Sequence, residues 1–132
     1  MKKTVFLKDY KPYAAEIHSC QMFFEILSEV VFVTTTLKYS TQDSSLFLDG
    51  EKLELLELFI NDDNVSPENY SHDESGLRLE SLPPTGSITT RVRLDPWSNK
   101  QLLGLYQSES LLVTQCEAEG FRRITFFPDR PD

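Results

Sequence analysis

The chain has 132 residues, 21 of them acidic and 13 basic, which gives a formal net charge of −8. This length suits one domain with one core and leaves no room for two. The acidic balance disfavours a nucleic-acid partner, because a negative surface repels a phosphate backbone and the basic residues are not gathered in one stretch. A cationic ligand, such as the free amino terminus of a peptide, suits this surface better.

Composition indicates a folded protein without a disulfide framework. Aromatic residues make up 11% of the chain, enough to anchor a sandwich or a barrel. Cys20 and Cys116 are the only cysteines, far fewer than a secreted disulfide scaffold carries. The opening stretch "MKKTVFLKDYKPY" has only three apolar residues in succession, too few for a signal peptide, and no stretch reaches the length of a membrane span. We therefore expect a cytoplasmic protein.

The first half of the chain is predicted to form strands. Glu16–Ile26 alternates with period two and should present His18, Cys20, Met22, Phe24 and Ile26 on one face. Val30–Ser40 is rich in β-branched residues, and the "LSE" between the two runs should close a hairpin. An Asp-Gly turn follows at Asp49-Gly50. The apolar phase then shifts between Leu53 and Ile60, which fits a helix or a bulged strand; we favour the strand, because it runs directly into the turn "NDDN".

The second half continues in the same way. Asn61–Gly76 is polar and is predicted to be turn material. Strands are expected at Leu77–Leu79, through Ile88 to Leu94, from Leu111 to Cys116, and in "RRITFF". About eight short strands separated by turns indicate an all-β sandwich or saddle-shaped curved sheet, and residues 1–132 show no internal domain boundary.

Two arrangements of residues suggest chemistry only weakly. His18 and Cys20, on one strand face, resemble a pair of metal ligands, but a zinc site needs three or four; a half-buried strand face is the favoured interpretation. Cys116 would be a nucleophile only with a base such as His18 or His72, and the glutamates beside it should raise the pKa of its thiol. A cysteine hydrolase is thus a minor alternative.

The C-terminal stretch "TQCEAEGFRRITFFPDRPD" is the most suggestive part of the sequence. Glu117 and Glu119 share a face if the segment is extended. They form either an acidic edge paired with Arg122 and Arg123, or an anchor for a ligand ammonium group through a charge-assisted hydrogen bond. Composition alone favours the acidic edge.

That stretch, together with "LLGLYQS", "KDYKPY" and "LFLDGEKLEL", resembles the N-terminal domain of bacterial aminopeptidase N, a zinc-dependent exopeptidase family of the gluzincin superfamily. The resemblance covers nearly the whole chain and is tightest over the last thirty residues. It implies an all-β saddle that packs over a thermolysin-like catalytic domain and lends one loop to the active site.

The resemblance also implies site residues. Glu117 matches the residue that binds the α-amino group of the substrate, and Gln115 matches a contact to the first residue of the substrate. The Gly-Ala-Met-Glu-Asn motif and the H-E-x-x-H helix of the family are not in this sequence. We therefore expect an incomplete N-terminal domain with no catalytic residue or metal ligand of its own. Zinc and peptidase activity would belong to the parent enzyme, which acts on peptides with a free N-terminus.

Two further expectations follow. If partner strands of the parent are missing, a sheet edge is exposed, and the chain should self-associate through it. The alternative to the aminopeptidase hypothesis is a free-standing β-sandwich interaction module without catalysis, which would tolerate the loss of Glu117.

Overall fold

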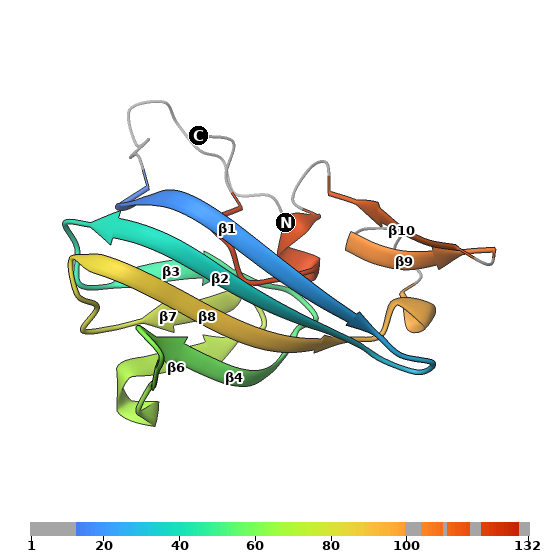
Figure 1. The fold of residues 1–132 in the computed structure, drawn as a ribbon, viewed down its shortest axis with the longest axis horizontal. Helices are drawn as coiled ribbons and strands as arrows, with labels where there is room; N and C mark the ends of the chain where they lie inside the picture. Colours follow the sequence, from blue (N-terminus) through green and yellow to red (C-terminus); the bar gives the residue numbers. More distant parts are fainter. Residues whose placement is uncertain (1–12, 100–103, 110, 117–119, 130–132) are drawn as a thin grey trace.

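The computed structural model describes residues 13–99, 104–109, 111–116 and 120–129, and these form a two-layered β-sandwich with a short ribbon beside it (Figure 1). The first layer is an antiparallel sheet in the order β1-β2-β8-β4-β5. Its strands are Ala15–Ile26 (β1), Val31–Thr41 (β2), Thr85–Leu94 (β8), Glu54–Ile60 (β4) and Asp63–Asn64 (β5).

The second layer is a smaller antiparallel sheet in the order β3-β7-β6, built from Leu46–Asp49 (β3), Gly76–Leu79 (β7) and Tyr70–Asp73 (β6). A separate two-stranded ribbon pairs Gly104–Ser108 (β9) with Leu111–Gln115 (β10). Three 3-10 turns complete the described elements: Pro67–Asn69 (η2), Pro96–Ser98 (η3) and Phe121–Arg123 (η4). The all-β prediction is confirmed.

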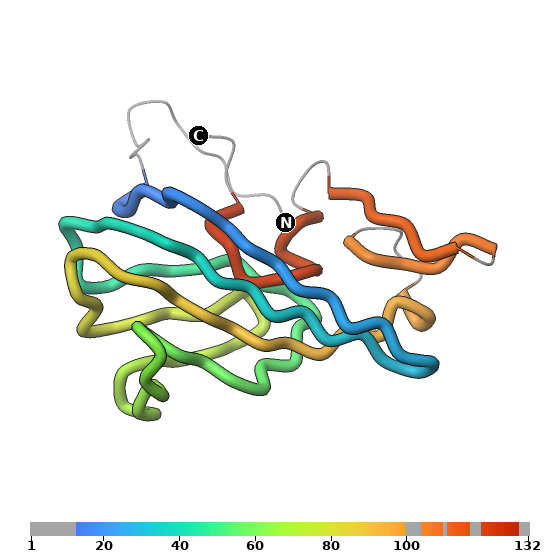
Figure 2. The backbone as a smooth tube through the Cα atoms, viewed as in Figure 1, coloured from blue at the N-terminus to red at the C-terminus, as the bar shows by residue number. Residues whose placement is uncertain are grey.

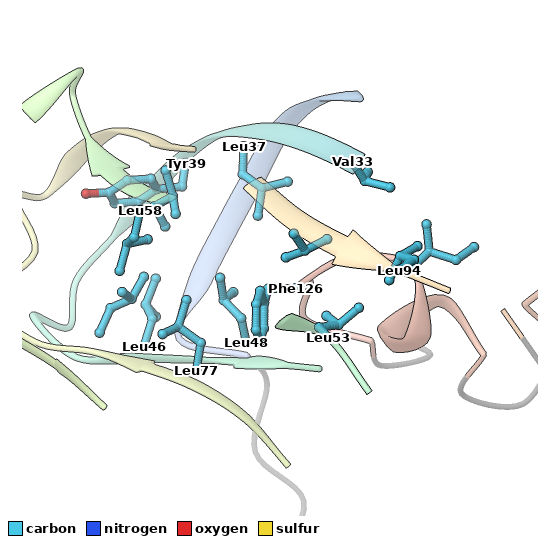
Figure 3. Close-up of a cluster of buried hydrophobic side chains, with 14 of the residues drawn as sticks. Val33, Leu37, Tyr39, Leu46, Leu48, Leu53, Leu58, Leu77, Leu94 and Phe126 are labelled. Carbon is cyan, nitrogen blue, oxygen red and sulfur yellow. The ribbon is translucent and has the colours of Figure 1, made fainter. Parts of the chain in front are cut away.

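The core lies between the two layers and follows the predicted alternation. In β2, the residues Val31, Val33, Thr35 and Leu37 are all buried. They face leucines of the second sheet, among them Leu48 and Leu77 (Figure 3). The strand beside the core therefore has the β-branched composition that packs best on a pleated surface.

Phe126 joins the C-terminal segment to this core. Its ring is fully buried and lies near Leu48 and Leu53 (Figure 3). A Cβ added at Gly50 would stand 2.4 Å from the Phe126 ring, so only glycine leaves room for it. The last described residues are thus part of the sandwich itself.

Several strand predictions are confirmed. The hairpin between β1 and β2 closes with the Leu27 N–H donating to the Val30 carbonyl at 2.9 Å, and Figure 2 shows this long hairpin running the length of the sheet. The apolar phase shift in β4 is a bulge, because its register against β8 slips between Leu55 and Glu57.

Two other predictions are wrong. "RRITFF" is not a strand: the chain turns through η4, and only Phe127 then forms an isolated bridge with Asp49. The turn is needed to bring Phe126 into the core. Asn61–Gly76 is not all turn, since it contains β5, η2 and β6. Just after Asp49-Gly50 the chain bends and passes from β3 in the second sheet to β4 in the first.

The predicted face of β1 is also wrong at one end. The register against β2 slips between Ile17 and Ser19, so His18 is the bulged residue. Beyond the bulge, Cys20 lies opposite the core residue Leu37, whereas His18 hydrogen-bonds Ser40 (Nε2–Oγ, 2.8 Å), next to buried Tyr39. The bulge therefore places His18 and Cys20 on opposite faces of the sheet.

Candidate functional site

The β9–β10 ribbon carries the first of the two residues implied by the resemblance. Gln115 is the last residue of β10, pairs with Gly104 of β9, and is exposed. In an antiparallel pair, alternate residues point to opposite faces, so Gln115 shares the face of Val113 and Tyr106. Glu117, like Glu119, lies outside the residues that the structure describes.

The two ends of the loop that contains Glu117 touch each other. The Gly120 N–H donates to the Cys116 carbonyl at 3.0 Å. A Cβ at Gly120 would lie 2.4 Å from the Gln115 carbonyl oxygen and 2.8 Å from the Cys116 Cα. Glycine is therefore required for this close backbone approach. We call Gln115, Cys116 and Gly120 the loop base; three residues of sequence separate its two sides.

Arg122, two residues past the loop base, is the centre of a charged cluster. Its backbone N–H and its Nε both donate to Asp129 Oδ2, at 3.2 and 3.1 Å, and its Nη2 donates to the Asp129 carbonyl at 3.1 Å. Its Nη1 lies 3.7 Å from Asp49 Oδ1. Asp49 Oδ2 in turn accepts from the Asp129 N–H at 3.0 Å. These three residues, which we call the arginine mount, tie the loop base to β3.

Arg123 and Arg91 are also paired with carboxylates. Arg123 Nη2 lies 3.1 Å from Glu51 Oε2. Arg91 lies between Glu25 and Glu57, at 3.4 and 3.8 Å. These carboxylates neutralise the positive charge of the arginines, which would otherwise be available to bind a phosphate backbone. The expected partnership of Arg122 and Arg123 with Glu117 and Glu119 involves two residues that are not described.

Cys116 is not activated as a nucleophile. Burial raises the pKa of its thiol, and the nearby Asp129 carboxylate raises that pKa further. The direction agrees with the sequence prediction, although the charge that the structure identifies comes from Asp129. His72 places its ring edge-on to Phe126, with centroids 5.4 Å apart, and His18 bonds Ser40, so both imidazoles are engaged elsewhere. Both cysteines are free thiols.

The donors present do not fit zinc. His18 and Cys20 lie on opposite faces of β1, and the described residues contain no group of three His, Cys, Asp or Glu side chains placed to hold a metal. A zinc site of three or four ligands therefore has no counterpart in the described part of this chain.

Sequence reasoning missed the arginine mount and one pocket. The mount joins residues about 80 positions apart, and Asp49 appeared in the sequence only as a turn residue. A pocket of about 380 Å³ lies beside the ribbon and is lined by Lys52, Arg123, Asp95, Asn99 and Leu105, among others. Gln115 pairs with Gly104, and Leu105 is the next residue of β9. Neighbouring residues of a strand point to opposite faces, so the pocket that Leu105 lines lies on the face of the ribbon opposite Gln115.

Comparison with known proteins gives consistent results, although no family model matches the chain. It is 38% identical over 133 residues to the aminopeptidase N of Caulobacter vibrioides and 35% identical over 127 residues to that of Escherichia coli. These alignments cover 98% and 94% of this chain but 15% and 14% of the relatives. The chain thus spans about one-seventh of the length of these relatives.

Solved structures agree on the fold. Legionella pneumophila aminopeptidase A, solved in complex with aspartic acid, superposes with a TM-score of 0.84 at 26% identity, over 96% of this chain and 16% of that one. An M1 zinc metallopeptidase from Deinococcus radiodurans, bound to a Tyr-Ser-Ala substrate, gives 0.72 at 14% identity, over 89% and 30%.

The resemblance to aminopeptidase N is therefore confirmed along nearly the whole chain. The helices of the described residues are single 3-10 turns, and none is long and apolar enough to cross a membrane.

Proposed function

We propose that this chain is an N-terminal β-domain of a zinc-dependent aminopeptidase, and that its 115–120 loop completes the substrate site. In this proposal Glu117 binds the α-amino group of a peptide, and Gln115 contacts the first residue of that peptide. The chain has no peptidase activity alone. The catalytic domain, with its zinc, belongs to polypeptide outside the described residues, whose own donors do not fit that metal.

The loop base is the observation that carries this proposal. The backbone contact of Gly120 with Gln115 and Cys116 closes the loop at the end of the β9–β10 ribbon, with Gln115 exposed. A short closed loop loses little conformational entropy when a ligand binds to it, so it suits a recognition element. The similarity to aminopeptidases N over 94–98% of the chain supports the same role.

The chemistry suits an exopeptidase. An ammonium group held by a carboxylate in a water-poor site gains a charge-assisted hydrogen bond, and a blocked or internal amide cannot replace it. Holding the amine also places the first peptide bond at a fixed distance from the reacting centre. Recognition and positioning therefore come from one contact.

The alternative, a free-standing interaction module, has one observation in its favour. Phe23, Ile26 and Leu27 are 63%, 57% and 52% exposed at the end of the β1–β2 hairpin, and such a patch marks a contact surface. A catalytic domain would cover it equally well, so Glu117 is the discriminating residue.

The experiment uses a graft: the Caulobacter vibrioides aminopeptidase N with its aligned segment replaced by this chain. We expect Glu117→Gln to lower kcat/KM for a free-amine peptide by about 10- to 100-fold, the value of a charge-assisted hydrogen bond. Glu109→Gln is the matched control, because Glu109 is an exposed carboxylate in the turn at the opposite end of β10. Equal kinetics for the Glu117 variant and this control would contradict the proposal.

We also place the protein in the cytoplasm. Two free thiols, without a disulfide, are typical of a reducing compartment.

A further inference from the structure

The arginine mount stands where the loop base meets the second sheet. The loop base leads directly into η4, whose cap Gly120 is two residues before Arg122. Asp49, on the other side of the mount, is the last residue of β3 and forms the antiparallel bridge with Phe127 (N–O 2.9 and 3.1 Å). The mount thus connects a rigid strand to one side of the loop.

Attachment of the C-terminal segment does not need the mount. Phe126 and Ile124 are 0% and 2% exposed and already fix this segment in the core. The hydrophobic effect is non-directional, however, so the orientation of the turn that precedes these residues depends also on hydrogen bonds. Arg122 supplies direction, because its backbone N–H and two of its side-chain nitrogens all bond the same residue, Asp129.

The surroundings strengthen these bonds. The Arg122, Asp129 and Asp49 side chains are only 15%, 17% and 21% exposed. Partly buried ion pairs are screened less by water and salt than surface pairs. The planar guanidinium of Arg122 also makes several bonds in a fixed geometry, which the ammonium group of a lysine could not reproduce. Arg123 adds a second tie through Glu51, whose N–H donates to the Arg122 carbonyl at 2.9 Å.

We propose that Arg122, acting through Asp129 and Asp49, is a positioning residue that fixes the orientation of the loop base relative to β3. This inference rests on the proposed function for its consequence: Arg122 sets where Glu117 meets the substrate amine. Arg122 itself touches no substrate.

The decisive experiment is a double-mutant cycle in the graft. We expect Arg122→Gln to lower kcat/KM about 10-fold for a free-amine peptide, since a small misplacement of a positioning contact costs one to two orders of magnitude. Combined with Glu117→Gln, it should cause no further loss, because both changes remove the same contact. Arg93→Gln is the matched control, since it removes an exposed arginine whose Nε is 3.9 Å from Glu54, and it should leave kcat/KM unchanged.

The outcomes separate the two proposals. If Glu117→Gln has no effect, the proposed function fails. If Glu117→Gln lowers kcat/KM but Arg122→Gln does not, the positioning role fails and the proposed function stands. The same holds if the double variant loses the product of the two single losses, because the two residues would then act independently.

Hydrogen exchange of this chain gives a readout that does not depend on activity. We expect Arg122→Lys, the milder variant, to speed exchange at the Gly120 amide, which bonds Cys116, about 10-fold while the amides of β2 keep their protection. Unchanged exchange at Gly120, or equal loss of protection in β2, would overturn the inference.

Discussion

Thr125 donates a hydrogen bond from its Oγ1 to Oγ1 of Thr35, 2.8 Å away and 90 residues earlier in the sequence, and both side chains are fully buried. Thr35 lies on β2, an inner strand of the first sheet, and Thr125 lies between η4 and Phe126. This bond connects the segment behind the loop base to the middle of the sandwich. The loop is therefore held by the core as well as by the arginine mount.

Breaking this bond should cost stability. Thr125→Val keeps the shape of the side chain but leaves the Thr35 hydroxyl without its buried donor, which we expect to lower the free energy of unfolding by about 1–3 kcal/mol. Urea unfolding measures it. The double variant Thr35→Val/Thr125→Val should recover part of the loss, because no unpaired hydroxyl remains. If the double variant lost as much free energy of unfolding as the two single variants together, or more, that result would contradict this account.

The contact between Gly50 and Phe126 makes a second prediction. Gly50→Ala places a Cβ 2.4 Å from a fully buried ring, and we expect overpacking to cost about 1–3 kcal/mol in urea unfolding. Gly86→Ala is the comparison and should cost less, because its Cβ would meet the exposed side chain of Asn61, whose Oδ1 accepts one hydrogen bond from the Ser87 N–H, and not a buried ring. An equal effect at the two positions would argue against the packing of Phe126.

The thiol of Cys116 reports on Asp129. Its raised pKa leaves less thiolate at a given pH, so alkylation should be slower than that of an ordinary exposed thiol at the same pH and should speed up as the pH rises. Asp129→Asn removes one of the two causes and should lower the pKa obtained from the rate–pH profile. A Cys20→Ser background isolates the signal, and Glu74→Gln, which removes another acid, is the control. An unchanged profile in Asp129→Asn would refute the electrostatic link.

The edge of β1 predicts self-association. β1 is the terminal strand of its sheet among the described residues, and Phe23 beside it is 63% exposed. We expect sedimentation velocity to show a concentration-dependent dimer that strengthens with salt, because salt screens the repulsion between two chains of charge −8. Phe23→Lys should weaken it. A monomer at every concentration would exclude edge pairing.

Sequence reasoning succeeded where burial alternates with the pleat. β2 and β8 bury every second residue, and the shift of phase in β4 correctly indicated a bulge. It failed for β6, in which three of four residues are exposed and no alternation is left to detect, and for β9, which was not predicted. The bulge at His18 could not be predicted from the sequence either, because the residues of β1 show an apolar alternation both with and without the shift in register.

The candidate site divides in the same way. Gln115 and Glu117 were identified from their resemblance to a family motif. The arginine mount was not, because charge patterns along the chain do not show that Asp49 and Asp129 meet in space. Long-range ion pairs depend on the packing of the two sheets, which local periodicity does not encode.

The most direct test of the central claim is whether this chain restores aminopeptidase activity to the Caulobacter vibrioides relative when it replaces the aligned segment. The measurement is kcat/KM for a free-amine peptide and for its N-acetylated form. We predict that the graft hydrolyses the free-amine peptide, that the N-acetylated form is inert, and that the relative without the segment is inactive. A folded graft that remains as inactive as the relative without the segment would contradict the claim that this chain completes an aminopeptidase site.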